Sequence, residues 1–200
     1  LPGMIAGHYG FSDIHIDLPR LCRAAGARFI QACAHQIDPA ERTVSLLGRP
    51  DLEFDLLSLD IGATPCRNIP GSELAIPVKP VGHFHRYWQQ LQQQVHSKHE
   101  PLRLGVVGGG LGGCELAMAI SWALEEPVYS GRVEIHLLHA GNKLPEDYPL
   151  LTRRLMAREL NRLKIHPHRN WRVAEITHRG VHNDEGKFLP LDKVLLCTEA

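Results

Sequence analysis

Three glycines at G-x-G-x-x-G spacing are the residues of this 200-residue chain best placed to do chemistry. Gly108, Gly110 and Gly113 lie in the stretch LGVVGGGLGGCELAMAI, and Leu111 lies inside the motif. In such a loop the first glycine permits a tight turn, the second lets the backbone approach a diphosphate, and the third allows close contact between strand and helix. Free N–H groups at the start of the next helix attract the phosphates. We predict a dinucleotide site here, and the alternative is a plain strand-to-helix turn.

The end of the next apolar segment should face the ribose of such a nucleotide. NAD sites usually place Asp or Glu there to accept a hydrogen bond from the 2′-OH. This sequence has LLHAGNK instead, with His139 at that position and Lys143 shortly after it. A neutral histidine hydrogen-bonds a ribose hydroxyl, whereas a nearby cation accommodates a 2′-phosphate. NAD(H) and NADP(H) therefore stay equal alternatives, and a surface histidine without such a role is the third.

The 13 histidines of the chain do not predict a metal centre. The close pairs are His83 with His85 and His166 with His168, and neither pair has a Cys or a carboxylate at zinc-site spacing. The sequence also lacks a G-x-S-x-G segment, which would indicate a hydrolase nucleophile. We therefore expect neither a metal site nor hydrolytic chemistry.

Alternating strands and helices in the second half of the chain should hold the glycine loop. The expected order is strand 102–107, helix 112–124, strand 132–139, helix 149–163 and strand 164–168, then strands within 171–180, 187–191 and 192–197. Such alternation is typical of a parallel sheet wound by helices. We predict an α/β fold with a Rossmann-like parallel sheet and a β-meander over residues 101–200.

The first half of the chain, residues 1–100, has a different pattern and is predicted to be a separate unit. We expect a helix over 17–26, two strands over 27–37 and 42–47, a buried strand over 54–59, and a helix over 83–98. Asp17 is the expected N-cap of the first helix and Gly26 its end. The last helix should bury one face, because Phe84, Trp88, Leu91 and Val95 recur at helical spacing.

Composition narrows the classes of partner and the setting. Lys plus Arg and Asp plus Glu both number 22, so no excess of positive charge indicates binding to nucleic acid. We expect no transmembrane segment in this chain, because no run of 18 apolar residues is present. Five cysteines without a CxxC pair favour a reduced, cytoplasmic setting. The chain begins LPGMIAGHYG and ends just after a predicted strand, so we expect a piece of a longer protein.

These motifs together resemble the FAD-dependent pyridine nucleotide-disulfide oxidoreductases. GGGLGGCELA is similar to the G-x-G-x-x-G-x-E-x-A of their NAD(P)H-binding domain, and KVLLCTEA is similar to its closing strand and turn. FDLLSLDIGATP resembles a strand by which their FAD-binding domain returns across the flavin nucleotide. GMIAGHYGFSDIHIDLPRLCRAAGARFI and AIPVKPVGHFHRYW resemble the branch related to type II NADH dehydrogenases, some bacterial members of which are joined to selenide, water dikinase.

The resemblance implies part of an FAD-binding domain in residues 1–100 and a C-terminally incomplete NAD(P)H-binding domain in residues 101–200. It implies that Glu115 lies near the nicotinamide and that Thr198 borders the same cofactor. Asp60 and Gly62 would lie along the edge of the flavin site. From the residues alone, Glu115 serves equally well as an acid that complements the helix dipole.

The function that the resemblance implies is a flavin-dependent NAD(P)H oxidoreductase with FAD and NAD(P)H as cofactors. Hydride would pass from NAD(P)H to FAD and electrons onward to a second acceptor, with a quinone as the candidate. Selenide, water dikinase is the candidate protein partner, and a peripheral position at the inner face of the bacterial membrane is the alternative to a cytoplasmic one. The family's FAD-binding GxGxxG and CxxxxC redox pair are absent from these residues, so this chain alone should be inactive. The other reading is an NAD(P)-binding regulatory module without turnover.

Overall fold

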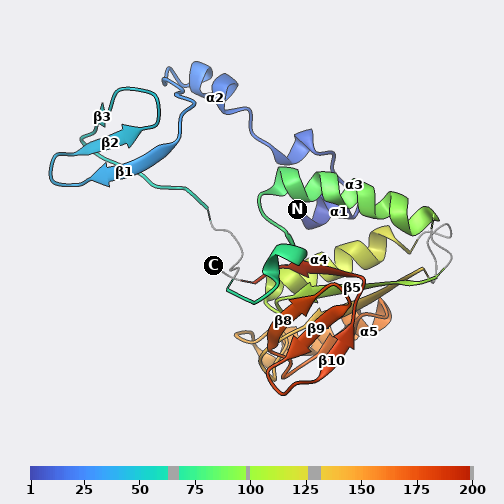
Figure 1. Ribbon diagram of the computed structural model, residues 1–200. Coiled ribbons are helices and arrows are strands. Elements are labelled where there is room, and N and C mark those ends of the chain that lie inside the picture. Colours follow the sequence, from blue (N-terminus) through green and yellow to red (C-terminus); the bar gives the residue numbers. More distant parts are fainter. Residues whose placement is uncertain (63–67, 98–99, 126–131, 199–200) are drawn as a thin grey trace. The chain divides into compact units, whose positions relative to one another are not determined.

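The computed structural model describes residues 1–62, 68–97, 100–125 and 132–198, in two compact units (Figure 1). Unit 1 combines Leu1–Ile14 with Ala63–Ala200, and unit 2 is His15–Gly62. The units therefore separate after residues 14 and 62 rather than near residue 100. The assignment of the two halves of the chain to FAD and NAD(P)H domains stays a prediction.

A five-stranded parallel sheet organises unit 1. Its strands, in spatial order, are β4 (Ile76–Pro77), β11 (Lys193–Leu196), β5 (Leu102–Val107), β6 (Val133–Leu138) and β7 (His166–His168). The chain crosses from β5 to β6 through α4 (Leu111–Ala123) and from β6 to β7 through α5 (Leu150–Arg162). β5 and β6 pair without interruption, from Leu102 beside Val133 to Val107 beside Leu138. The predicted parallel sheet wound by helices is confirmed.

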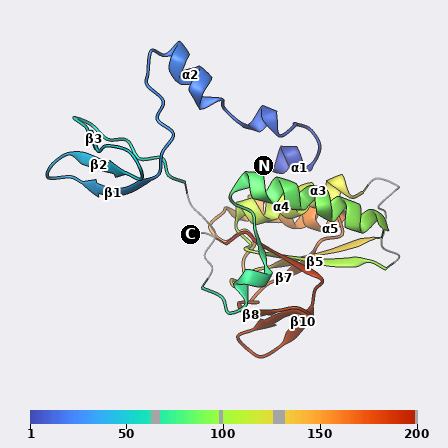
Figure 2. The ribbon, with the colours of Figure 1, turned by 45° about the horizontal axis from the view of Figure 1, so that its top comes forward.

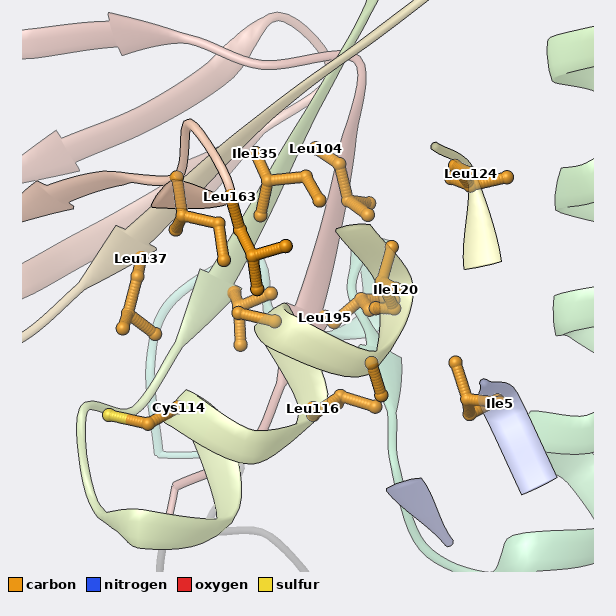
Figure 3. Close-up of a cluster of buried hydrophobic side chains, with 14 of the residues drawn as sticks. Ile5, Leu104, Cys114, Leu116, Ile120, Leu124, Ile135, Leu137, Leu163 and Leu195 are labelled. Carbon is orange, nitrogen blue, oxygen red and sulfur yellow. The ribbon is translucent and has the colours of Figure 1, made fainter. Parts of the chain in front are cut away.

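Alternation along the central strands builds a core on each face of the sheet, because successive side chains of a strand point to opposite faces. Leu104, Ile135 and Leu195 pack against the helices, and Figure 3 shows them around α4. Leu138 lies three positions after Ile135 on β6, and Leu196 directly follows Leu195 on β11. Both therefore point to the other face, where they form a second core with the β-meander. The helices and the meander therefore cover opposite faces of the sheet (Figure 2).

The meander is a three-stranded antiparallel sheet in the order β10-β9-β8. Its strands are β8 (Val173–Thr177), β9 (Gly180–Asn183) and β10 (Phe188–Pro190). This confirms the predicted meander, although β9 was not expected as a separate strand. Gly180, where β9 begins, has a φ of 145°, and a Cβ there would collide with the carbonyl oxygen of Leu189.

Three short or amphipathic helices complete unit 1: α1 (Pro2–Ile5), η1 (Ser12–Ile14) and α3 (Val81–Ser97), with the short turn η2 (Ser72–Leu74) before β4. The stripe predicted for α3 is confirmed, because its buried residues are Phe84, Trp88, Leu91 and Val95. These side chains share one core with α4 and with Ile5 of α1. The helix α3 thus belongs to the same packed unit as the glycine loop.

Unit 2 contains α2 (Leu18–Ala24), β1 (Ala34–Asp38), β2 (Thr43–Leu46) and β3 (Leu52–Glu53). Asp17 caps α2 as predicted, and its carboxylate accepts a hydrogen bond of 3.0 Å from the Arg20 N–H. β1 and β2 form the expected antiparallel pair, with Ile37 opposite Val44.

The buried strand predicted over residues 54–59 is wrong. These residues form no strand, and Leu56 is 91% exposed. An apolar run becomes a buried strand only where neighbouring strands pair with it and other elements cover it. Within the described part of the chain, no strand pairs with this run. The Gly/Pro loop expected after it lies mostly outside the described residues.

Candidate functional site

A cavity of about 1030 Å³ lies at the carboxyl ends of the central strands of unit 1. Val107 at the end of β5, Leu138 at the end of β6 and Cys197 just after β11 contribute to its wall. β5 lies between β6, to which the chain continues through α4, and β11, which comes last in the sequence. Ligands of doubly wound sheets bind at this place, where the strand order reverses. The volume is at the upper end of the range of small-molecule sites, which suits a dinucleotide.

The first and third glycines of the motif have the steric roles predicted for them. Gly108 has a φ of 121°, and a Cβ there would lie 2.5 Å from the carbonyl oxygen of Cys197. A Cβ on Gly113 would collide with the carbonyl oxygen of Gly108. Side chains at these positions would therefore push α4 away from β5 and β11. The structure contains the tight cradle that a diphosphate needs, while phosphate binding itself stays a prediction.

The amino end of α4 opens into the same cavity. Gly110 is the N-cap, and no side chain caps the helix. Gly110, Leu111 and Gly112 all line the cavity. Because the first N–H groups of a helix lack intrahelical partners, this end of a 13-residue helix presents donors and the positive end of its dipole. An anionic diphosphate fits these donors, so the residues present suit a dinucleotide.

The structure brings His139 to the cavity but not Lys143. His139 follows β6 and lines the cavity with an exposed fraction of only 9%. Lys143 is exposed and is not among the residues that line the wall. Two acids that sequence reasoning missed, Glu146 and Asp147, do line it. The available signal was the pair of acids in PEDY, just before a predicted helix.

Thr198 lies on the cavity wall next to Cys197, and its role beside the cofactor stays a prediction.

Two cysteine thiols lie beside the glycine loop. Burial raises the pKa of the Cys197 thiol. Burial, together with the nearby Cys197, raises the pKa of the Cys114 thiol to about 12. Both thiols are therefore protonated at neutral pH, and a thiol rather than a thiolate is a poor nucleophile. These two cysteines beside the glycine loop are not poised for thiol–disulfide chemistry.

The other predicted cofactor residues do not line the cavity. Glu115 is exposed and is the fifth residue of α4, so it lies beyond the first helical turn. Its alternative role as a complement to the helix dipole is therefore weakened, since that effect fades beyond the first turn. Asp60 and Gly62 are exposed residues of unit 2. Their roles beside a nicotinamide and a flavin stay predictions.

Three histidines cluster where β6 and β7 pair. The Nδ1 of His136 and the Nε2 of His168 are 3.0 Å apart, and the ring of His166 stacks on His136 with centroids 5.2 Å apart. Burial and the neighbouring histidines lower the pKa of His136 to about 4, and burial lowers the pKa of His168. Among the described residues, no group of three or more His, Cys, Asp or Glu side chains is arranged to hold a metal ion.

This cluster predicts that the chain loses stability in mild acid. Between pH 6.5 and about 4 the unfolded chain binds a proton at His136 that the folded chain does not, so stability falls as the pH falls through this window. The loss for His136 is at most about 3 kcal/mol. Urea unfolding at pH 7.5 and pH 5 measures it, and His136→Leu should flatten the difference. His178→Leu, on an exposed histidine, is the control; a wild-type pH dependence in His136→Leu would contradict the assignment.

No helix in the described part of the chain combines the length and apolar character needed to cross a membrane.

Comparison with known proteins gives consistent matches. The model of the family described as pyridine nucleotide-disulphide oxidoreductase matches residues 22–198. Demethylphylloquinone reductase NdbB from a Synechocystis strain is 27% identical over 184 residues, which are 88% of this chain and 44% of that protein. The chain therefore spans less than half the length of this curated relative.

Solved structures show the same fold. The sulfide:quinone oxidoreductase of Aquifex aeolicus has a TM-score of 0.81 at 19% identity, over 100% of this chain and 48% of that chain. NDH2 from Plasmodium falciparum has a TM-score of 0.83 at 16% identity, over 97% of this chain and 46% of that chain. These likenesses confirm the predicted class, an α/β arrangement within a two-dinucleotide-domain fold.

Proposed function

The chain belongs to the pyridine nucleotide-disulphide oxidoreductase family, and on that premise we propose that it supplies the NAD(P)H-binding part of a flavin-dependent NAD(P)H oxidoreductase. One observation carries the proposal. The glycine cradle of Gly108 and Gly113 and the uncapped amino end of α4 face a single cavity at the reversal point of the sheet. This arrangement suits a dinucleotide diphosphate better than a plain turn, which needs no cavity.

In the whole protein, NAD(P)H would supply a hydride to FAD, and the electrons would pass to a second acceptor. This chain would contribute binding and orientation, because cofactors perform the difficult chemistry and the protein positions them. The glycine loop would hold the diphosphate. Val107, Leu138 and Val78 would shield the bound nucleotide from water with an apolar wall. We propose a quinone as the second acceptor, supported by the names of the demethylphylloquinone reductase and the sulfide:quinone oxidoreductase.

Burial raises the pKa of the Cys114 and Cys197 thiols beside the glycine loop, so these two cysteines are not poised to take part in a reaction that uses a protein disulfide. A hydride that passes directly between two cofactors needs close, aligned rings and no cysteine intermediate. The proposal therefore needs no redox cysteine pair from this chain.

A regulatory module that binds NAD(P) without turnover is the second candidate function. It is favoured by one observation: every residue that lines the cavity belongs to unit 1. Nucleotide binding would then not require a flavin, and the chain could respond to the nucleotide through its own conformation.

Two further proposals concern the partner and the place of work. The N-terminal segments that resemble the branch joined to selenide, water dikinase support association with that enzyme. Gel filtration of the chain with a purified bacterial selenide, water dikinase tests it, and separate elution of the two would contradict it. A peripheral position at the membrane is supported by the quinone-related names, and sedimentation of the whole protein with lipid vesicles tests that position.

Nucleotide binding by the chain itself is the first expectation of the proposed function. Titration of the purified chain with NADH should give saturable enhancement of nicotinamide fluorescence, with a dissociation constant between about 1 μM and 1 mM, the usual range for enzyme substrates. AMP should compete, because it occupies the adenosine half of the site. A chain that is folded by circular dichroism but binds neither NADH nor NADPH would contradict the proposal.

A further inference from the structure

The position that usually carries the ribose-binding acid holds a buried histidine in this chain. His139 follows β6, and a Cβ placed on Gly109 would lie 2.5 Å from the Cγ of its ring. The ring is therefore held tightly against the glycine loop. Its Nε2 is buried without a hydrogen-bond partner among the described residues. An imidazole so enclosed cannot readily turn to hydrogen-bond a ribose. It is well placed to hold a neighbouring side chain in position.

The neighbour at this nitrogen is the carboxylate of Glu146. Its Oε2 is 3.7 Å from the Nε2 of His139. A Cβ on Gly141 would lie 2.7 and 2.8 Å from the two carboxylate oxygens of Glu146 and 2.8 Å from the same histidine nitrogen. The carboxylate thus lies over the backbone just past the end of β6, where only a glycine leaves room. Glu146 also lines the cavity, and its side chain is 55% exposed, so one side of the carboxylate remains open to a ligand.

The two acids on this part of the wall oppose a phosphate. Asp147 adds a second acid to the same wall, and Lys143 does not line it. Two cations do line the cavity. The positive charge of Lys79 opposes the rise that burial causes in the pKa of the Cys197 thiol, so Lys79 lies near the end of β11. β11 is two strands away from β6 in the sheet. Arg172 lines the cavity near the end of β6, because the N–H of the preceding Trp171 donates to the carbonyl oxygen of His139. Its Nε is 3.9 Å from a carboxylate oxygen of Asp184, but both side chains are more than half exposed, so this screened pair leaves the guanidinium charged.

We propose that the carboxylate of Glu146, positioned by His139, accepts a hydrogen bond from the 2′-OH of the adenine ribose and makes the site select NADH over NADPH. The inference rests on the proposed function, since it concerns the same nucleotide site. A carboxylate accepts hydrogen bonds from a ribose diol and repels a 2′-phosphate, so a single group supplies both the attraction and the rejection. The acid comes from the loop before α5 instead of from the end of the strand.

The test compares NADH and NADPH binding to the purified chain by nicotinamide fluorescence. The wild-type chain should bind NADH at least tenfold more tightly than NADPH. Glu146→Gln should shift this ratio at least tenfold toward NADPH, because the amide keeps an acceptor but loses the charge. Glu175→Gln, which removes the same charge from an exposed residue of β8 that does not line the cavity, should shift the ratio less than threefold.

His139→Phe tests the positioning role, because phenylalanine keeps a ring against Gly109 and loses the nitrogen. It should move the NADH/NADPH ratio at least threefold toward NADPH, and adding Glu146→Gln to it should give no more than Glu146→Gln alone. A purely structural role would weaken both nucleotides equally and leave the ratio unchanged, which would overturn that part of the inference.

The possible results distinguish a failure of the proposed NADH selectivity from a failure of nucleotide binding itself. A chain that binds both nucleotides equally, or whose ratio is unmoved by Glu146→Gln, overturns the inference and leaves nucleotide binding intact. A ratio that responds to Glu175→Gln as strongly as to Glu146→Gln also overturns it, since the net charge of the chain would then decide. A folded wild-type chain that binds neither nucleotide overturns the proposed function itself.

Discussion

Gly113→Ala should reduce NADH binding at least 100-fold, whereas Gly112→Ala should leave it within about threefold. A Cβ on Gly113 would collide with the carbonyl oxygen of Gly108, so α4 must shift away from the glycine loop. That shift moves the helix N–H groups out of line with the diphosphate. Hydrogen bonds to a charged group contribute about 1.5–3 kcal/mol each, so losing two of them costs about 100-fold or more. A Cβ on Gly112 would meet only the Cys197 sulfur, at 4.0 Å, which is an ordinary contact.

The two variants are closely matched, because Gly112 and Gly113 are neighbours in α4 and both gain the same methyl group. Alanine is intrinsically better than glycine in a helix by about 1 kcal/mol, so propensity alone would favour both variants. Fluorescence titration with NADH gives the affinities, and thermal unfolding shows whether each variant is folded. Equal affinities in two folded variants would contradict the strand–helix contact that we assign to Gly113.

Phe84→Ala should lower the free energy of unfolding of unit 1 by about 3–5 kcal/mol, the usual cost of removing a buried phenylalanine. Phe84 is fully buried in the core shared by α3 and α4. A loss of this size is a large fraction of the total stability of a domain, about 5–15 kcal/mol. NADH binding should weaken as well, because α4, whose amino end lines the cavity, packs on the same core.

Tryptophan fluorescence during urea unfolding measures this effect on unit 1 alone. The three tryptophans of the chain are Trp88, Trp122 and Trp171, and all belong to unit 1. Gln90→Ala, on the exposed side of α3, should change stability by less than about 0.5 kcal/mol. An unchanged tryptophan transition in Phe84→Ala would show that α3 does not belong to this unit, as the sequence-based boundary near residue 100 implied.

Local patterns in the sequence predicted the elements whose structure is decided locally. The strand over 102–107 matches β5 residue for residue, because a short apolar run before a glycine loop has few other options. The buried face of α3 followed from the spacing of its apolar residues alone. The turn at Gly108 followed from the motif, since only glycine takes a positive φ there without strain.

Features that depend on distant neighbours could not be predicted in the same way. The run 54–59 has the composition of a buried strand, but burial depends on partner strands that local sequence does not specify. Glu146 lies seven residues after His139, and only the path of the loop over Gly141 brings the two side chains together. Lys143 is only four residues after His139, yet it does not line the cavity wall. The acids of PEDY were visible in the sequence, but the contact between Glu146 and His139 was visible only in three dimensions.

The most direct test of the central claim is the visible spectrum of the protein extended to its natural ends, recorded anaerobically before and after NADH is added. If this chain is the nucleotide-binding part of a flavin-dependent oxidoreductase, the extended protein should show the visible absorption of a bound flavin, and one equivalent of NADH should bleach it. A protein without flavin, or with flavin that neither NADH nor NADPH reduces, would contradict the claim and favour the regulatory module.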